Sequence, residues 1–551
     1  TADFRPWLDY TLDVEAAGCY VLSVAEANSP AVAVGDALSV YVNGVEQTAY
    51  YNAVSTGSWS TTALRRVATM ELPAGRVTLR VKANPNRATG NYDYFTLRPL
   101  AEVVTPIGTA AELLALMQDK DKWSGHYYLT ADIDLAGAAG QAPIGTTATN
   151  FTGSFDGCGH TVRGLSLTTS SEKDFGLFGK TKDAVIARLT VEGQVTSTTV
   201  KDAVVGGIVG TADPGTVIVN CENRATVLYT GDGTNTAKGV GGVCGYVYAG
   251  GTLTGTAVKG CTNTGSVTSL SGTKESNVGG IVGCFRANTG GGNATVYACT
   301  NTGDVRATGI RAGGIVGYAY QSGGRGMEIL ASRNCGTVST DKGRTGGIVG
   351  MVYSTYTDKN YTPRVADCIN EGAVHAGTGY ETGGIVGFTA GGSLARCVNL
   401  GSVTANDEKP CGGVTGKTYS PTTASGIVYG IDTCYTTSLA PLPEEAHESA
   451  DFYPVTATET VTAAALLGGE TALPLGTDGY LVTPAGLLPA ALCRGSARGD
   501  VNADGSITVL DALLALHGCL NGGAPYTLAD CNEDGTLNLV DILFLLRYCG
   551  A

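Results

Sequence analysis

The chain has little charge, no long apolar run and no concentration of basic residues. Only 15% of its 551 residues are Asp, Glu, Lys or Arg, and the formal net charge is −14. Without a basic stripe to neutralise phosphates, a nucleic-acid partner is excluded. No apolar stretch reaches the roughly eighteen residues that a membrane-spanning helix needs, so we expect no membrane span. The motifs His-Glu-x-x-His and Gly-x-Ser-x-Gly are also missing, so the sequence gives no sign of a zinc protease or a serine hydrolase.

Glycine is abundant. The 80 glycines are about twice the usual share, and they follow neither a collagen period nor a proline-rich pattern. This composition predicts a mainly β chain with many tight turns, and the length predicts three or four domains. The 16 cysteines are spread along the chain and many recur at one position of a repeat. We therefore expect most of them to be small buried hydrophobes with free thiols rather than cross-links.

Two short patterns alternate between about residues 175 and 435. The first is Gly-Gly-(Ile/Val)-x-Gly, whose copies start 29 to 38 residues apart. The second is Cys-x-Asn-x-Gly-x-Val, with degenerate copies at Cys221 and Ser332. Copies of the first start at Gly206, Gly241, Gly279, Gly313, Gly346, Gly383 and Gly412, and full copies of the second at Cys261, Cys299, Cys368 and Cys397.

The repeat predicts a parallel β-helix, a solenoid of stacked strands. Glycine and threonine are poor helix formers, which excludes a helical array of similar period, and the alternation within the second pattern is that of a strand with one buried face. Stacking identical strands places identical residues in ladders along the axis. We expect the glycines to occupy corners with positive φ. The predicted inward stack is Cys221, Cys261, Cys299, Cys368, Cys397 and Cys434, and the predicted amide ladder or turn lining is Asn223, Asn263, Asn301, Asn370 and Asn399.

The repeats resemble the GLUG repeat of secreted bacterial β-helix proteins. Upstream, Thr109 and Glu112 form a capping box that predicts a helix from Ala110 to about Asp119, and the segment as a whole resembles the entry cap of such solenoids. Residues 463–467 and 479–482 resemble a closing rung. We assign residues 101–493 to this β-helix.

The resemblance leaves the activity of the solenoid open. One hypothesis is a polysaccharide lyase or glycoside hydrolase, which a cluster of carboxylates on one face would favour. Another is a structural adhesin, spacer or filament subunit, favoured by long polar ladders. The catalytic residues remain unknown, because the charged residues of the repeats are scattered singly and are expected to be solvated on turns. These residues are Asp304, Arg306, Arg311, Arg325, Arg344, Arg364 and Glu381.

Residues 1–100 alternate in the manner of short strands broken by Gly, Pro and Asn, which predicts a β-sandwich. The segments 10–14, 38–44, 56–59, 72–75 and 90–97 resemble carbohydrate-binding modules of families 6 and 35. That resemblance implies that Trp59 offers a flat ring to a sugar and that Asn91 hydrogen-bonds a hydroxyl beside it; the alternative is that Trp59 belongs to the core. Such modules begin well upstream of Thr1, so we expect the sandwich to be incomplete and the chain to be a fragment.

The last segment, 494–551, contains two twelve-residue loops in tandem. They begin at Asp500 and Asp530, and each has oxygen-bearing side chains at the ligand positions, glycine at position 6 and an apolar helix directly after it. Hard oxygen donors at this spacing predict calcium sites, so we expect two bound Ca2+ ions. The predicted ligands are Asp500, Asn502, Asp504, Ser506, Thr508 and Asp511 in the first loop, and Asp530, Asn532, Asp534, Thr536, Asn538 and Asp541 in the second.

Two features separate these loops from a calmodulin-type EF-hand: Asp stands at position 12, and no helix precedes the first loop. A duplicated loop and exit helix of this kind resembles the type I dockerin of cellulosomes. The resemblance implies a cohesin domain of a scaffoldin as the partner, docking through either of two related helices. The implied cohesin-contacting residues are Val509, Leu510, Leu516, His517, Leu539, Val540, Leu546 and Arg547.

The sequence therefore predicts a secreted, three-part protein of mainly β structure: a sandwich, a parallel β-helix and a small α-helical EF-hand-like dockerin. We expect it to attach to a scaffoldin and to engage plant or other polysaccharides.

Overall fold

The structure is a computed structural model in which most of the sandwich and the solenoid, and parts of the C-terminal segment, are described. Among these residues, no helix combines the length and apolar character needed to cross a bilayer. The described residues are 7–28, 38–47, 50, 56–83, 91–198, 200–231, 238–250, 255–271, 276–288, 292–323, 326–355, 362–377, 381–406, 411–418, 430–436, 458–460, 480–483, 486–489, 492, 500–502, 507, 509–520, 526, 528–529, 531, 537, 541–543 and 545–546.

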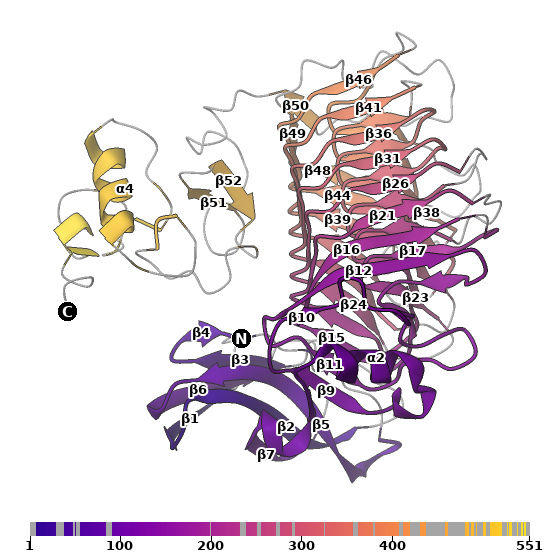
Figure 1. Ribbon diagram of the computed structural model, residues 1–551. Helices are drawn as coiled ribbons and strands as arrows, with labels where there is room; N and C mark the ends of the chain where they lie inside the picture. The colour runs from indigo at the N-terminus through magenta and orange to yellow at the C-terminus, as the bar shows by residue number, and fades with distance from the viewer. Residues whose placement is uncertain are drawn as a thin grey trace.

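The N-terminal segment folds as two antiparallel sheets packed face to face, which confirms the predicted sandwich fold (Figure 1). Alternate side chains of each strand point into the space between the sheets. Val24, Val40 and Val67 are fully buried there. The first sheet has the order β1 (Trp7–Val14), β6 (Gly75–Ala83), β3 (Leu38–Val42) and β4 (Val45–Glu46), and the second β5 (Ser58–Leu72), β2 (Gly18–Asn28) and β7 (Asn91–Pro99).

A short helix, α1 (Leu100–Val103), leads from the sandwich into the cap of the solenoid. The predicted capping box is present: Glu112 N donates to Thr109 Oγ1 at 3.3 Å, and Thr109 N donates to Glu112 Oε2 at 3.0 Å. It opens α2 (Ala110–Gln118), which ends one residue before the predicted limit. The 3-10 turn η1 (Lys120–Lys122) follows. Helix α2 buries Leu113, Leu116 and Met117 against the first rungs, which closes the end of the core.

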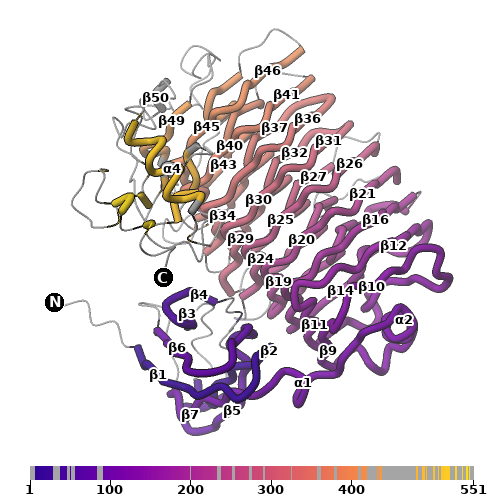
Figure 2. Tube along the Cα trace, turned by 60° about the vertical axis from the view of Figure 1, so that its left-hand side comes forward, coloured from indigo at the N-terminus to yellow at the C-terminus, as the bar shows by residue number. Residues whose placement is uncertain are grey.

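The middle of the chain is a solenoid in which parallel strands stack from rung to rung, as predicted (Figure 2). The longest sheet has the order β10 (Ile133–Asp134), β12 (Thr161–Thr169), β16 (Thr190–Ser197), β20 (Glu222–Asn223), β21 (Thr226–Tyr229), β25 (Thr262–Asn263), β26 (Val267–Ser269), β30 (Thr300–Asn301), β31 (Val305–Ala307), β35 (Arg333–Asn334), β36 (Val338–Thr340), β40 (Ile369–Asn370), β41 (Val374–Ala376), β45 (Val398–Asn399), β46 (Val403–Ala405), β49 (Cys434–Thr436) and β50 (Thr458–Thr460).

Further parallel sheets complete each rung. One contains β8 (Thr105–Ile107), β9 (His126–Leu129), β11 (Ser154–Asp156), β15 (Val185–Ala187), β19 (Val217–Val219), β24 (Thr256–Lys259), β29 (Ala294–Tyr297), β34 (Met327–Leu330), β39 (Arg364–Ala366), β44 (Ser393–Ala395) and β48 (Gly430–Asp432). Another contains β13 (Asp174–Phe175), β17 (Val204–Gly206), β22 (Val240–Gly241), β27 (Val278–Gly279), β32 (Ala312–Gly313), β37 (Thr345–Gly346) and β42 (Thr382–Gly383). A further sheet contains β14 (Phe178–Thr181), β18 (Val209–Ala212), β23 (Cys244–Ala249), β28 (Val282–Ala287), β33 (Val316–Gln321), β38 (Val349–Ser354), β43 (Val386–Ala390) and β47 (Thr415–Thr418).

The predicted interior ladders are confirmed. Each asparagine of the repeat is fully buried, and from Asn223 to Asn370 its Nδ2 donates to the Oδ1 of the asparagine on the next rung at 2.7–2.8 Å. Each cysteine of the predicted inward stack is also buried, and no disulfide links two of the described cysteines. The asparagine ladder runs through Asn223, Asn263, Asn301, Asn334, Asn370 and Asn399 and ends on Thr436.

The prediction that the repeated glycines form positive-φ corners is wrong. In Gly279-Gly280 neither residue has a positive φ. A Cβ on Gly280 would lie 2.1 Å from the carbonyl oxygen of Gly314 and 2.3 Å from Cγ of Asn301, so the pair is needed because backbone and ladder amide approach it closely. The left-handed corners lie one residue before each stacked Cys or Ser, at Asn220, Gly260, Ala298, Ala331, Asp367, Arg396 and Thr433.

The predicted closing rung is also wrong. Residues 480–482 belong to β51 (Tyr480–Thr483), which pairs antiparallel with β52 (Gly486–Pro489) in a hairpin of its own, whereas residues 463–467 lie outside the described part. The hairpin packs on the outside of the last rungs through Tyr480, whose hydroxyl donates to the carbonyl of Arg396 at 2.5 Å. Antiparallel pairing of two short apolar segments cannot continue a parallel rung.

The C-terminal segment contains α4 (Val509–Leu520) and helical residues at 541–543 and 545–546. Their buried faces form a small core with Val501, Ala515 and Ile542. Tyr526 contacts both this core and the hairpin cluster, and Leu528 packs with Leu481 of the hairpin.

Candidate functional site

The sandwich presents the two predicted sugar-contacting residues at one end of its three-stranded sheet. Trp59, at the start of β5, is 48% exposed, so it lies at the surface rather than in the core. Asn91, at the start of β7, donates from Nδ2 to the backbone carbonyl of Trp59 at 3.0 Å. Asn91 therefore fixes the strand that carries the ring, and its side-chain oxygen is the atom left for a ligand hydroxyl.

Buried polar side chains lie at the same end of the sheet. Glu26 pairs with Tyr92 in the strand register and lies 3.6 Å from Nε of Arg65. Burial raises the pKa of Glu26 to about 7, against the opposing effect of Arg65. Asn28 is fully buried, and its amide atoms make no hydrogen bond within the described residues.

Our sequence reasoning missed Glu26, Asn28 and Arg65. The available signal was the alternation of β2, because Glu26 and Asn28 fall on the same inward parity as Leu22 and Val24. A carboxyl and an amide at buried positions of a strand are costly unless a partner satisfies them. Glu26 and Asn28 therefore mark a buried polar region at this end of the sheet.

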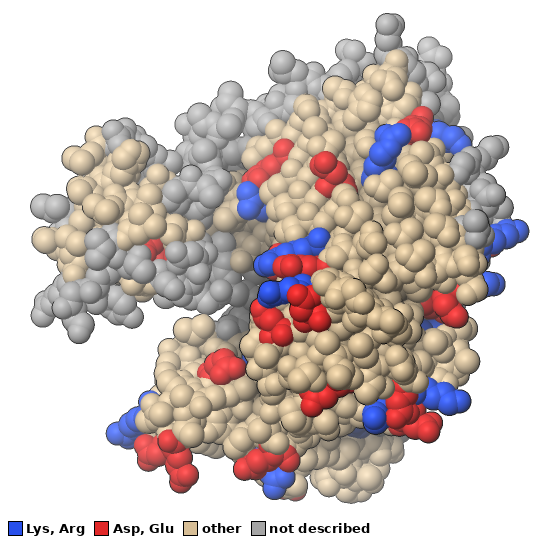
Figure 3. Space-filling model, viewed as in Figure 1, with Lys and Arg blue, Asp and Glu red and all other residues tan. Residues whose placement is uncertain are grey.

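The prediction that the charged residues of the repeats are solvated singly is wrong for those that form ion pairs between rungs. Asp304 is exposed and accepts a hydrogen bond from the N–H of Thr337, and Arg325 lies outside the described residues. Acidic and basic side chains lie next to one another on the described face in Figure 3. Arg311 is buried over the ring of Tyr318. The ion pairs include Arg306–Asp341, Arg344–Glu381, Arg364–Glu328 and Arg333–Glu371.

Two further carboxylates of the solenoid are held by neighbouring side chains. Asp174 accepts hydrogen bonds from the hydroxyls of Thr147 and Thr211, and Asp213 lies 3.3 Å from Nζ of Lys180. Burial raises the pKa of Asp213. Both oxygens of Asp174 accept hydrogen bonds, and Asp213 is paired with Lys180. Neighbouring side chains therefore hold both carboxylates in place.

The two C-terminal loops close on their twelfth residue in the same way. In the first, Asp511 Oδ1 accepts from the backbone N–H groups of Val501 at 2.8 Å and of Asn502 at 3.3 Å. In the second, Asp541 Oδ1 accepts from the N–H of Cys531 at 2.9 Å. The matched bonds to Val501 and Cys531 show that both loops fold back onto the start of their helix.

The carboxylates of these loops that the structure describes are buried. Asp500, Asp511 and Asp541 are all fully inaccessible. Burying an ionised carboxylate costs several kcal/mol unless a cation compensates it. Oxygen donors at loop positions 1, 3 and 12 are those that calcium prefers, so the residues present fit that ion.

The remaining predicted ligands lie outside the described residues. They are Asp504, Ser506, Thr508, Asp530, Asn532, Asp534, Thr536 and Asn538. For this reason the described residues alone contain no group of three or more potential metal-binding His, Cys, Asp or Glu side chains.

Residues 498–549 match the family described as Dockerin type I domain. They are a type I dockerin. This confirms the resemblance that the two loops predicted, and type I dockerins generally bind calcium. No curated protein matches the chain.

Several solved structures are similar to other parts of the chain. A family 35 carbohydrate-binding module from Clostridium thermocellum is 22% identical, over 17% of this chain and 71% of that one, with a TM-score of 0.16. A putative immunoglobulin A1 protease from Bacteroides ovatus is 17% identical, over 66% and 86%, with a TM-score of 0.36. The catalytic domain of a GH87 alpha-1,3-glucanase is 12% identical, over 78% and 91%, with a TM-score of 0.20. None of these similarities carries an argument about activity.

The dockerin exposes a row of leucines. Leu510, Leu513 and Leu520 are 52%, 56% and 75% exposed, and His517 lies on the same side of α4. Residues at this spacing share one face of a helix. Leu543, thirty positions after Leu513, is 58% exposed, so the two halves of the dockerin present matching apolar positions.

The predicted cohesin-contacting residues are only partly brought together on this surface. Leu510, His517 and Leu546 are exposed, whereas Leu516 packs partly into the dockerin core. Sequence reasoning missed Leu513, Leu520 and Leu543, although their helical spacing from Leu510 and their thirty-residue repeat were readable. Leu539, Val540, Arg547 and the side chain of Val509 lie outside the described residues.

Proposed function

We propose that this protein is a secreted component of a cellulosome-type assembly. Its dockerin binds two Ca2+ ions and a scaffoldin cohesin, its sandwich binds a polysaccharide, and its solenoid separates the two. The proposal that the dockerin binds a cohesin rests on its exposed leucine face, on a domain whose loops close on buried carboxylates. An apolar face this exposed on so small a domain is costly in water and is typical of an interaction surface.

The solenoid is proposed as a non-catalytic spacer. Its asparagine ladder satisfies the buried amides from rung to rung, and the described carboxylates discussed above are held by threonine, lysine or arginine partners. A continuous ladder of paired amides rigidifies a repeat structure. Polysaccharide cleavage by the purified full chain, measured as release of reducing ends, would contradict this assignment.

Docking through either helix predicts a graded response to substitution. Leu513→Asp or Leu543→Asp alone should weaken cohesin binding only a few fold, because the other helix still presents an apolar face. The double variant should weaken binding at least about 100-fold, since each desolvated leucine of an interface core contributes on the order of 1–3 kcal/mol. Calorimetric titration of the calcium-loaded full chain with a panel of type I cohesins gives the measurement.

Leu64→Asp is the matched control, because Leu64 is equally exposed but lies on β5 of the sandwich. It should leave the cohesin affinity unchanged. If the double variant keeps its far-ultraviolet circular dichroism and binds as tightly as the parent protein, the leucine face is not the docking surface.

The polysaccharide half is tested at Trp59. Trp59→Ala should reduce polysaccharide binding about tenfold or more, because the exposed ring is the flat surface on which a pyranose would pack. The matched control is Trp7→Ala: Trp7 is similarly exposed but lies on β1, under the guanidinium of Arg80. Affinity electrophoresis on a set of plant polysaccharides separates the outcomes. Equal losses from both variants would place the binding surface elsewhere.

A further inference from the structure

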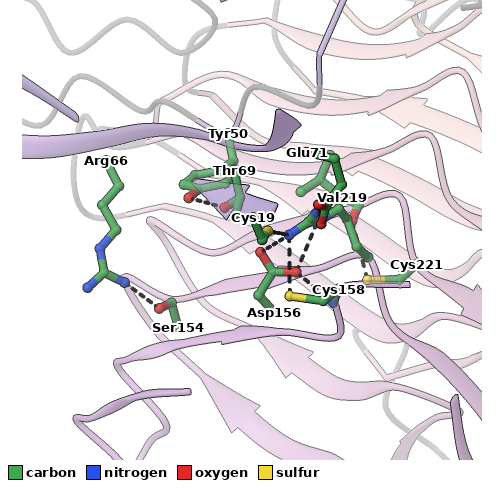
Figure 4. Close-up of polar contacts among 11 residues, drawn as sticks. Cys19, Tyr50, Arg66, Thr69, Glu71, Ser154, Asp156, Cys158, Val219 and Cys221 are labelled. Carbon is green, nitrogen blue, oxygen red and sulfur yellow. Dashed lines mark hydrogen bonds and ion pairs between the residues drawn. The ribbon is translucent and has the colours of Figure 1, made fainter. Parts of the chain in front are cut away.

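Two cysteines lie where the sandwich meets the solenoid, in the cluster shown in Figure 4. Cys19 is the second residue of β2, and Cys158 lies in the turn between β11 and β12. Arg188 joins them: its Nη2 lies 3.0 Å from Sγ of Cys19 and 3.4 Å from Sγ of Cys158. Both sulfurs therefore lie within hydrogen-bonding distance of one guanidinium nitrogen, across the boundary between the sandwich and the solenoid.

Arg188 is itself fixed. Its Nε and Nη2 donate to the two oxygens of Asp156 at 3.0 Å and 2.9 Å, and Glu71 of the sandwich lies 3.9 Å from Nη1. A bidentate pair of this kind holds the guanidinium in one orientation. The cation is therefore held permanently beside both sulfurs.

These cysteines differ in chemical setting from those of the interior stack. Cys261 and Cys299 are fully buried and donate to backbone carbonyls, and burial raises the pKa of both thiols. Cys19 and Cys158 are partly exposed. The hydrogen bond from Cys158 and the charge of Arg188 lower the pKa of Cys19, whereas donating that bond, together with burial, raises the pKa of Cys158. This is the asymmetry of an attacking thiolate and a resolving thiol.

The backbone at Cys158 is strained. Its φ is 49°, in the left-handed region, between Gly157 and Gly159. A cysteine there costs on the order of 1 kcal/mol or more relative to glycine. Cys158 packs in the cluster that contains Val21 and Cys19 of the sandwich.

We propose that Cys19 and Cys158 form a disulfide that covalently joins the sandwich to the solenoid. The oxidant is a low-molecular-weight disulfide. The Cys19 thiolate attacks one of its sulfurs, and the external S–S bond breaks to release one small thiolate. Cys158 then loses its proton to solvent and attacks the Cys19 sulfur of the mixed disulfide, expelling the second small thiolate. Two protein thiols are oxidised and one external disulfide is reduced.

The pairing itself does not depend on the proposed function, whereas the oxidising surroundings that would maintain it follow from the proposed secretion. If the disulfide between Cys19 and Cys158 did not form, cohesin binding and polysaccharide binding would remain intact. Those two measurements therefore separate this inference from the proposed function.

The test is peptide mapping of the native full chain after equilibration with oxidised and reduced glutathione, followed by quenching with an alkylating reagent. We expect one cross-linked peptide pair, containing Cys19 and Cys158, while Cys261 and Cys299 stay reduced. Cys19→Ser should abolish the cross-link. Cys158→Ser should stop the reaction at a glutathione adduct on Cys19. Cys335→Ser, which removes another partly exposed cysteine, should leave the cross-link unchanged.

The rate at which Cys19 forms its glutathione adduct distinguishes a reactive cysteine pair from two cysteines that are merely close together. Glu71→Gln removes a negative charge that raises the pKa of Cys19, so it should speed adduct formation at neutral pH by a few fold while the fold stays the same. Absence of the 19–158 cross-link in a chain that binds cohesin normally would overturn the proposal. The proposal would also be overturned if Cys19 were oxidised at the same rate as Cys335 and the products contained no disulfide between Cys19 and Cys158.

Discussion

Removing calcium should abolish cohesin binding while the rest of the protein stays folded. Asp500, Asp511 and Asp541 are fully buried carboxylates, and without a cation their desolvation opposes folding of a domain with a very small core. We expect chelation to weaken cohesin binding by a factor of about 100 or more, equivalent to ~2.8 kcal/mol, and added calcium to restore it. Calorimetric titration before and after chelation measures the change.

The tryptophans allow the two parts of the molecule to be followed separately. Trp7, Trp59 and Trp123 all lie in the sandwich or the solenoid cap, so their fluorescence should not change on chelation, while helical circular dichroism falls. Asp511→Ala combined with Asp541→Ala should reproduce the loss in the presence of calcium, and Asp93→Ala, on exposed β7, should not. A chelated protein that still binds cohesin with unchanged affinity would refute the assignment of these loops.

The second large effect is expected at the centre of the asparagine ladder. Asn301 donates from Nδ2 to the carbonyl of Gly303 and to Oδ1 of Asn334, both at 2.8 Å, and accepts from Asn263 at 2.7 Å. Asn301→Leu keeps the approximate volume but removes three hydrogen bonds made with buried polar groups of Gly303, Asn334 and Asn263. At about 1–3 kcal/mol for each of these losses, the solenoid should lose about 3–9 kcal/mol of unfolding free energy.

Denaturant unfolding of the full chain, followed by Trp123 fluorescence and circular dichroism, measures this loss. Thr302→Ala is the control, because Thr302 is the exposed residue directly after Asn301 and should change stability by less than about 0.5 kcal/mol. If Asn301→Leu unfolds at the same denaturant concentration as the control, the ladder contributes no net stability.

The solenoid could be predicted because its signals are local and repeated. Cys261, Asn263 and Val267 recur at fixed offsets, and in-register stacking is the arrangement that brings identical residues into contact without leaving a buried amide unpaired. The reason for the paired glycines could not be predicted in this way. Composition alone does not distinguish a positive φ at Gly280 from a close approach to Asn301, which depends on the neighbouring rung.

The candidate sites also differ in whether they follow from the local sequence or depend on three-dimensional packing. The predicted calcium ligands Asp500 and Asp511 follow from one-dimensional spacing, so that prediction could be made directly from the sequence. The polar rim around Glu26 and the sulfur pair Cys19–Cys158 depend on strand register and on the packing of two domains, which a single sequence does not specify. Likewise, the antiparallel hairpin β51–β52 carries no period that separates it from a final rung.

The position of Tyr526 has a mechanical consequence. Its ring belongs at once to the dockerin core and to the cluster that anchors Tyr480 on the last rungs, and Leu528 adds a second contact to the hairpin. A scaffold that grips the docking helices would therefore transmit tension and torque directly into the solenoid. The sandwich at the other end of the solenoid would then keep a fixed orientation relative to the scaffold.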